Sequence, residues 1–333
     1  AVTIVMKDGI CKRIRTPKRM FKPSDTFDNQ VTPNLEIDIN ELPKIMGKHF
    51  KFQNEEDLKL LILFIVSCFG GLSINIPLLV CWGEKGSGKT TFLRKVKRII
   101  DPEKNDLMTM PKNKSDLQIM LNNSFFVVLD NLSYLSKRDS DLIATTVTGS
   151  TAMRRKLYED TKEIRLDLHC IIGINGISLV TKEADVLDRA VLFQLVRLDD
   201  EEIETEKELW ESFNTDLPDI VGGCMKTLAI AMADMEEVKL TKKIRMADWM
   251  VLAVKVGRVL GWGEKAVEKI IWNNAKKVNE VTLQEDIVAT FVIELLDEYD
   301  NEYANSVSGL LGDIQQIAKK NNTNLGLLPQ SAN

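Results

Sequence analysis

The segment GEKGSGKT, Gly83–Thr90, has the residue types and spacing of a phosphate-binding loop. Glycines let backbone N–H groups turn toward an anion, and the helix expected next adds the positive end of its dipole. At this spacing a lysine reaches the outer phosphates of a nucleotide, and the hydroxyl residue after it binds Mg²⁺. The pattern predicts a site for ATP and Mg²⁺ formed by Gly83, Glu84, Lys85, Gly86, Ser87, Gly88, Lys89, Thr90 and Thr91.

A second segment, VVLDNLS (residues 127–133), ends an apolar run with Asp130. A carboxylate at the end of a buried strand is suited to hold Mg²⁺ together with Thr90. The next residue is Asn131, where most ATP-driven motors have a glutamate that activates water, and an amide cannot accept a proton as a carboxylate does. An amide can still orient water, so we expect slow hydrolysis, with Glu84 and Asp141 as candidate substitute bases.

Two polar residues follow in an order that suits the same chemistry. Asn175 ends the apolar run LHCIIGI, where its amide is expected to orient the attacking water. Arg189, in DVLDRA, precedes another apolar run, and a planar guanidinium there is suited to contact a γ-phosphate bound by a neighbouring subunit. Taken singly, each residue also fits a loop-capping or surface role. The candidate catalytic residues are Lys89, Asp130, Asn131, Asn175 and Arg189.

Short apolar runs alternate with helical or polar segments in the middle of the chain. Strands are expected at 76–82, 107–110, 125–129, 168–174 and 191–196. The segment after the loop is expected to form a helix with Lys95 and Lys97 among its outward-facing residues. Alternating strands and helices predict an α/β fold with a mostly parallel sheet and helices on both faces.

After Asp199 the strand pattern stops, and four amphipathic helices are expected at 201–213, 217–235, 245–261 and 263–278. We interpret the start at Ala1, without an initiator Met, as a sign of processing or of a longer parent protein. The predicted organisation is a basic N-terminal arm or linker (1–37), an N-terminal helical subdomain (38–74), a P-loop core (75–199), a helical lid (200–280) and a C-terminal helical segment (281–333).

Bulk composition narrows the classes of function. The 333 residues carry a net charge of −5, so contact with nucleic acid has to be local rather than spread over the surface. The five cysteines lack CxxC or His-paired spacing, which favours reduced thiols without zinc and a cytoplasmic location, in the host cell if the protein is viral. Glycines and Pro77 interrupt the uncharged stretch 60–83, so two buried elements are expected there and no membrane partner.

In order along the chain, GEKGSGKTT, VVLDNLSYLS, RRKLYED, GINGI, DVLDRA and RMADW resemble motifs of phage and mobile-element helicase-like ATPases. These AAA+ proteins are related to superfamily 3 helicases and often follow a primase or primase-polymerase domain. The resemblance covers residues 38–298 and implies an AAA+ core, an all-helical lid and a partial winged-helix-like C-terminal unit. It also implies a ring, expected to be a hexamer, with ATP sites between subunits and single-stranded or primer-template DNA in its pore.

The same resemblance suggests roles for two further segments. The stretch 149–167 lies where related helicases carry a pore hairpin. Cations at its tip are expected to bind DNA phosphates and a tyrosine to stack on bases, although a solvated basic turn is the alternative. The expected DNA-binding residues are Arg154, Arg155, Lys156 and Tyr158. Arg245 lies roughly where a lid offers an arginine to the nucleotide; a salt bridge with Asp248 at a helix start is the alternative.

The sequence therefore predicts an ATP-dependent DNA helicase or translocase domain of a replication protein. One alternative is an ATP-dependent loader or assembly platform for a primase-polymerase, in which the nucleotide acts as a switch with slow hydrolysis. A small-molecule kinase, which also uses a P-loop, is another. The LDRA segment and the helical lid favour a ring ATPase over the kinase.

Overall fold

The computed structural model describes residues 3–14, 28–155, 163–197, 205–285, 287–299, 302–321 and 328, with the backbone alone at 3, 154, 155, 163, 278–285 and 287. The chain forms two compact units, residues 1–275 and 276–333. The strands are β1 (Thr3–Lys7), β2 (Ile10–Ile14), β3 (Leu78–Trp82), β4 (Phe126–Leu132), β5 (Ser150–Arg155), β6 (Glu163–Leu168), β7 (Ile171–Gly176) and β8 (Ala190–Gln194). The helices are α1 (Leu42–His49), α2 (Glu55–Cys68), α3 (Lys89–Ile100), α4 (Lys114–Asn123), α5 (Lys137–Val147), α6 (Ala184–Leu187), α7 (Glu206–Ala233), α8 (Ala247–Val259), α9 (Glu264–Glu285), α10 (Ile287–Glu298) and α11 (Val307–Lys320), with short 3-10 turns η1 (Ile39–Glu41) and η2 (Gly71–Ser73).

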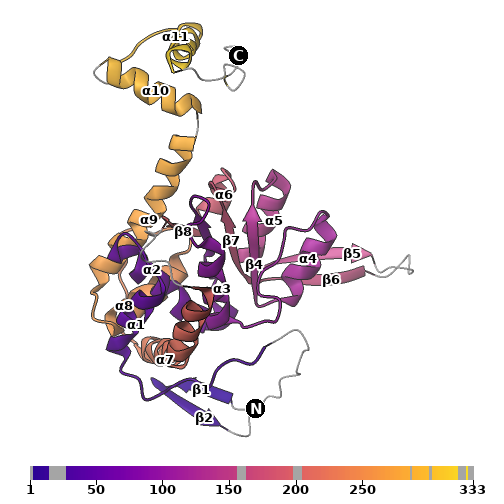
Figure 1. Ribbon diagram of the computed structural model, residues 1–333, viewed down its shortest axis with the longest axis vertical. Helices are drawn as coiled ribbons and strands as arrows, with labels where there is room; N and C mark the ends of the chain where they lie inside the picture. Colours follow the sequence, from indigo (N-terminus) through magenta and orange to yellow (C-terminus); the bar gives the residue numbers. More distant parts are fainter. Residues whose placement is uncertain are drawn as a thin grey trace. The chain divides into compact units, whose positions relative to one another are not determined.

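A four-stranded parallel sheet in the order β4-β7-β3-β8 forms the centre of the first unit (Figure 1). Every residue of β3 and β7 is buried. Because successive side chains of a strand point to opposite faces, such strands need cover on both faces of the sheet. The α/β class and the parallel sheet predicted from the sequence are confirmed.

The carboxyl ends of parallel strands meet at one edge of a sheet, and this edge collects the candidate catalytic segments. The loop after β3 begins at Gly83, and Asn175 of β7 pairs in register with Cys81, two residues before that loop. On the other side of β7, β4 carries Asp130 close to this edge, two residues before the strand ends at Leu132. The strand order therefore places Asn175 between the loop and Asp130.

The prediction of a strand at 107–110 is wrong, because this segment forms one isolated bridge, Met108 to Leu129, beside β4. Met108 donates to the Val128 carbonyl at 2.9 Å and accepts from the Asp130 N–H at 2.9 Å. Pro111 follows directly and has no backbone N–H to continue a ladder. The segment therefore covers the edge of β4 over a short distance only.

Helix α3 begins directly after the loop and contacts β4 and β7. Lys95 and Lys97, expected to face outward, are both buried. Lys95 donates to the His49 carbonyl at 3.0 Å, and Lys97 donates to the Phe126 carbonyl at 2.6 Å and to Asp101 at 2.8 Å. A pattern of charged residues cannot show that carbonyl and carboxylate groups will receive an ammonium beneath the surface.

The long helix α7 is the centre of the helical part of the first unit, where α1, α2 and α8 contact it. The sequence predicted two helices here, whereas α7 continues through Pro218. Phe213 and Leu217 before the proline and Ile220 and Val221 after it are fully buried, so packing on both sides keeps the helix continuous. The start of the expected N-terminal arm forms an antiparallel hairpin, β1–β2, which also contacts α7.

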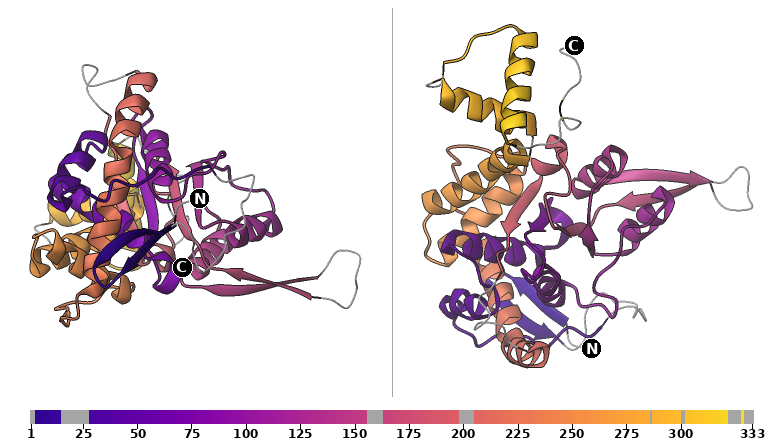
Figure 2. Two further views of the ribbon diagram at one scale, coloured as in Figure 1. Left: turned by 90° about the horizontal axis from the view of Figure 1, so that it is seen from below. Right: turned by 45° about the horizontal axis from the view of Figure 1, so that its top comes forward.

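Strands β5 and β6 form the hairpin expected between residues 149 and 167, with register pairs from Ser150–Leu168 to Arg155–Glu163. Figure 2 shows this two-stranded ribbon extending away from the parallel sheet. Helix α4 contacts β6. The tip, residues 156–162, lies outside the described residues and includes the candidate DNA-binding residues Lys156 and Tyr158.

In the second unit α10 and α11 pack around a small apolar core formed by Phe291, Leu295, Ile314, Ile317, Ala318 and Leu328. Helices are the only regular elements among the described residues of this unit, and a winged-helix-like continuation stays a prediction. The five segments expected along the chain likewise remain a predicted domain organisation. No helix in the described part of the chain combines the length and apolarity needed to cross a bilayer.

Candidate active site

The loop between β3 and α3 has a backbone that requires glycine. Gly86 and Gly88 have φ values of 86° and 76°, which residues with a side chain rarely adopt. At Gly83 a Cβ would lie 2.0 Å from the Leu195 carbonyl oxygen of the segment after β8. The three glycines are thus needed by the fold of the loop itself, in the strand–loop–helix context that the sequence predicted.

Lys89 is the first residue of α3, and its ammonium returns to the loop. It donates to the carbonyls of Gly83 and Glu84, both at 2.7 Å, and to Ser87 Oγ at 3.3 Å. The loop therefore combines a glycine-rich backbone, the start of a helix and one ammonium group. Together these features bind phosphate groups. Glu84 and Lys85 are exposed, and Thr91 lies in the first turn of α3.

A chain of hydrogen bonds links the loop to the ends of β4 and β7. Thr90 Oγ1 donates to Asp130 Oδ1 at 3.2 Å, and Asn175 Nδ2 donates to the same oxygen at 2.5 Å. Asn175 Oδ1 in turn accepts from the backbone N–H of Asn131 at 2.5 Å. Because Asn175 is 1% exposed, both ends of its amide are fixed inside the protein. Four predicted site residues, distant in sequence, are brought together here.

Asn131 has a left-handed backbone, with φ of 57°. The register between β4 and β7 shifts between Leu129 and Leu132, so the strand bulges at this point. The bulge turns the N–H of Asn131 to Asn175 and leaves the residue exposed. Asparagine tolerates this conformation better than most residues, whereas glutamate does not. The missing glutamate thus has a structural reason in the backbone.

Arg189 and Arg245 share one carboxylate. Arg189 Nη1 lies 2.5 Å from Asp185 Oδ1, and Arg245 Nη1 lies 2.7 Å from the same oxygen. Arg189 also donates to the Asp185 carbonyl. The hydrogen bond from Arg189, aided by the charge of Arg245, lowers the pKa of the Asp185 carboxyl. Arg245 is thus paired with Asp185, whereas the sequence suggested Asp248 as the alternative.

The donor set fits the expected metal and nucleotide. Mg²⁺ at a phosphate site usually takes one or two protein oxygens and completes its shell with phosphate and water. The hydroxyl of Thr90 and the carboxylate of Asp130 supply two adjacent oxygens beside the loop. No cluster of three His, Cys, Asp or Glu side chains suited to a metal occurs in the described part of the chain.

Residues 44–270 match the sequence family described as the actinomycete integrative conjugative element replication protein. The chain belongs to this family. The match confirms the resemblance to replication proteins of mobile elements that the motifs suggested. No curated protein matches the chain significantly.

Several solved structures are similar to the chain. An apo structure of the NrS-1 C-terminal region has 14% identity and a TM-score of 0.41, and the match covers 64% of this chain and 55% of that one. A further apo structure of the NrS-1 C-terminal region (305–718) has 13% identity and a TM-score of 0.37, covering 91% and 71%. A JCV helicase structure has 12% identity and a TM-score of 0.36, covering 73% and 65%. Family membership rests on the sequence match alone.

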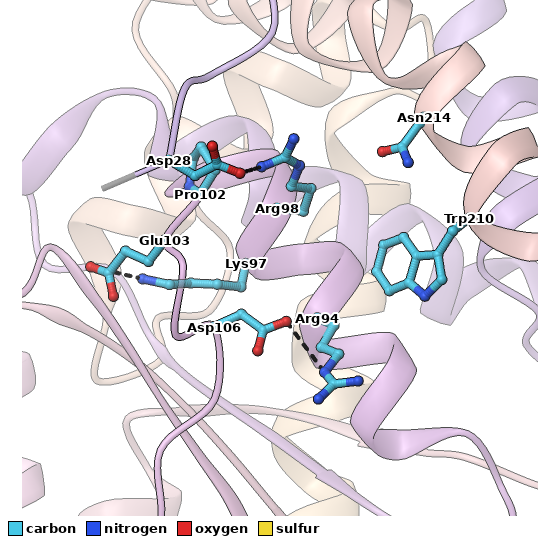
Figure 3. A pocket seen from close by; sticks show the side chains of 9 residues that line it. All are labelled: Asp28, Arg94, Lys97, Arg98, Pro102, Glu103, Asp106, Trp210 and Asn214. Carbon is cyan, nitrogen blue, oxygen red and sulfur yellow. Dashed lines mark hydrogen bonds and ion pairs between the residues drawn. The ribbon is translucent and has the colours of Figure 1, made fainter. Parts of the chain in front are cut away.

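A cavity of about 250 Å³ lies along the second half of α3, on residues other than those of the phosphate loop (Figure 3). Its side chains include as many carboxylates as cations. Burial raises the pKa of one of these carboxyls, that of Glu103. The charges pair within the lining, so the cavity does not compete with the loop as an anion site. The pairs are Arg94–Asp106 at 3.3 Å, Lys97–Glu103 at 3.3 Å and Arg98–Asp28 at 2.6 Å.

Of the predicted DNA-binding residues, Arg154 and Arg155 belong to β5, and their side chains lie outside the described set, as do Lys156 and Tyr158 altogether. One residue of the site escaped the sequence analysis, namely Asp185. Its spacing of four residues from Arg189 is a signal that could have been read on a helix. Its pairing with Arg245, sixty positions further on, could not.

Proposed function

We propose that the chain is an ATP-dependent DNA helicase or translocase domain of a replication protein, that it assembles into a ring, expected to be a hexamer, and that it hydrolyses ATP between subunits. The hydrogen-bond chain that joins Thr90, Asp130, Asn175 and Asn131 beside the glycine loop carries this proposal. It brings a metal-binding oxygen pair, a phosphate-binding loop and two amides to one edge of the sheet. Membership in a family of replication proteins supports the cellular role.

Each candidate site residue has a distinct task in this proposal. Loop 83–88 and Lys89 bind the phosphates of ATP, while Thr90 and Asp130 hold Mg²⁺, which neutralises phosphate charge when bound. Asn175 positions Asp130 and the backbone of residue 131, since both ends of its amide are engaged there. The exposed side chain of Asn131 orients the attacking water. Arg189 of a neighbouring copy stabilises the charge that develops on the transferred phosphate.

DNA binding is proposed for the β5–β6 hairpin, which extends away from the sheet (Figure 2). In a ring, hairpins from several copies would gather basic tips in one channel, although the chain as a whole is acidic. Phosphate contacts there bind single-stranded or primer-template DNA without reading its sequence, and an aromatic residue stacks on bases. A primase or polymerase domain, in the same chain or as a partner, would use the DNA that the ring delivers.

ATP hydrolysis with and without single-stranded DNA tests the motor. The wild-type protein should hydrolyse ATP slowly and speed up with DNA, while Lys89→Ala should lose at least about a hundredfold in turnover. Lys112→Ala, which removes an exposed lysine outside the site, is the matched control. Unchanged DNA-stimulated turnover in Lys89→Ala would refute the proposal. Negative-stain images with ATP and DNA test the ring.

The hairpin has its own experiment. Removing its cations should weaken binding of single-stranded DNA and flatten the dependence of affinity on salt by about 0.7 in log–log slope for each phosphate that the variant no longer neutralises. ATP binding should stay intact. A salt slope equal to that of the wild-type protein would exclude the hairpin from DNA binding. The test variant replaces Arg154, Arg155 and Lys156 by alanine, and the control replaces the exposed Lys207, Lys239 and Lys243.

One observation favours a second candidate, an ATP-dependent loader or assembly platform with slow or no unwinding. Residue 131 is an amide held by a left-handed backbone, so the usual carboxylate base is missing from its place. A switch needs ATP binding and ring formation but little turnover. ATP-dependent assembly on DNA, together with turnover that DNA does not stimulate, would select this candidate over the motor.

A further inference from the structure

The two arginines around Asp185 form an incompletely satisfied cluster. Two guanidinium groups approach one carboxylate oxygen, so a single negative charge faces two positive ones. Arg189 is 7% exposed, and its Nε is buried and has no hydrogen-bond partner among the described residues. A buried donor without a partner is costly, as is an unbalanced cation. An anion with more charge and more oxygens than a carboxylate would complete this cluster.

The cluster does not belong to the phosphate loop of its own chain. The Arg189 carbonyl accepts from the N–H of Leu78, the first residue of β3, at 2.8 Å. The loop follows Trp82, the last residue of that strand, which lies about 13 Å further along the sheet at about 3.3 Å per residue. Arg189 therefore begins at the opposite edge of the sheet from its own loop. Arg245, which the sequence suggested for its own nucleotide, shares a carboxylate oxygen with Arg189 instead.

We infer that Arg245 acts together with Arg189 on the nucleotide of a neighbouring copy, and that Asp185 is a positioning residue which pairs the two arginines and competes with the terminal phosphate for them. The inference rests on the proposed function. Before the copies meet, the carboxylate holds both guanidinium groups and limits the like-charge repulsion between them. When a neighbour presents a nucleotide, its terminal phosphate replaces Asp185 as the shared acceptor. A planar guanidinium can form paired hydrogen bonds to either anion.

Mixing experiments locate the site of action of Arg245. A Lys89→Ala copy supplies arginines without binding ATP productively, and an Arg189→Ala copy binds ATP but supplies no Arg189. Each alone should be nearly inactive, and their mixture should regain turnover. Adding Arg245→Ala to the arginine-supplying copy should reduce the regained turnover at least about tenfold more than adding it to the ATP-binding copy, by analogy with arginines that act across interfaces. The reverse order would overturn the inference and return Arg245 to its own nucleotide.

Competition by Asp185 is tested on the same mixture. Asp185→Asn on the arginine-supplying copy keeps the shape of the side chain and removes its charge, so half-maximal recovery should need a several-fold lower ATP concentration. Asp188→Asn, an exposed neighbour, is the matched control. Circular dichroism checks that each variant is folded. Arg245→Lys on the arginine-supplying copy keeps the positive charge and serves as a second check that a loss of turnover is not a folding defect. An unchanged or higher ATP requirement in Asp185→Asn overturns the competition. Absence of any turnover in the wild-type protein would instead overturn the proposed function, and this inference with it.

Discussion

The left-handed backbone at Asn131 leads to a specific prediction about the residue that stands where a catalytic glutamate is expected. The perturbation is a series of three substitutions, to glycine, alanine and glutamate. Glycine adopts a φ of 57° freely, whereas residues with an ordinary side chain pay about 1–2 kcal/mol for it. The cost of this φ for asparagine lies between those for glycine and for other residues, because its short side chain can form local hydrogen bonds.

The expected changes in the free energy of unfolding follow from which atoms of residue 131 interact with the rest of the protein. The N–H of residue 131, which any of the three replacements retains, makes the bond to Asn175. We therefore expect Asn131→Gly to change the free energy of unfolding by less than about 0.5 kcal/mol, because its easier φ offsets the greater freedom of the unfolded chain. Asn131→Ala and Asn131→Glu should each cost about 1 kcal/mol. Asn131→Glu should also fail to raise ATP turnover, because strain at the bulge opposes the geometry that a base would need.

The assay is urea unfolding followed by circular dichroism, combined with ATP turnover for each variant. Differences of about 1 kcal/mol shift the folded-to-unfolded ratio roughly fivefold and are measurable. Equal stability of the glycine, alanine and glutamate variants would show that the backbone at this position is not held left-handed. A tenfold or greater gain of turnover in Asn131→Glu would show that the carboxylate, and not the bulge, limits the reaction.

Three further predictions concern other parts of the first unit. Gly83→Ala places a Cβ 2.0 Å from the Leu195 carbonyl oxygen, so ATP binding should weaken at least tenfold and unfolding measurements should show a loss of about 1–3 kcal/mol. Lys97→Met leaves two largely buried carboxylates without their ammonium and should destabilise by about 3–5 kcal/mol in urea unfolding, whereas Lys112→Met on the surface should have little effect. Burial lowers the pKa of His49, so the unfolded state binds more protons, and the free energy of unfolding should fall as pH drops from 6.5 towards that lowered pKa. Between pH 7.5 and pH 5.5, His49→Gln should therefore lose less stability than the wild-type protein. An equal loss in both proteins would exclude His49 as a cause.

The sequence predicts the parts of the site that depend on local chemistry. Glycine spacing and a following lysine require only strand, loop and helix in that order, so Lys89 and Thr90 could be placed before the fold was known. The apolar runs that end in Asp130 and Asn175 predict the same sheet edge. The direction of the Asn175 amide could not be predicted, since it depends on a one-residue bulge in a neighbouring strand.

Longer-range contacts limited the rest of the prediction. Lys97 is 1% exposed because the Phe126 carbonyl and Asp101 receive its ammonium, and a helical wheel contains no information about groups on other segments. The helix through Pro218 is a similar case, because packing outweighs the missing backbone hydrogen bond. Arg189 and Arg245 both contact Asp185 because folding brings their two segments to one carboxylate, and the sequence pattern does not show this.

These contacts support the proposal that the reaction rate depends on assembly. In the proposed function, one chain binds a nucleotide and its metal with the ammonium of Lys89 beside the loop, the hydroxyl of Thr90 in α3 and the carboxylate of Asp130 in β4. The two arginines proposed to act on the transferred phosphate are held by Asp185, and Arg189 starts from the opposite edge of the sheet. Since phosphoryl transfer relies mainly on positioning and charge stabilisation, a single copy should bind ATP well and hydrolyse it poorly. Turnover per chain should therefore rise with protein concentration, and this rise would be absent if the arginines served their own nucleotide.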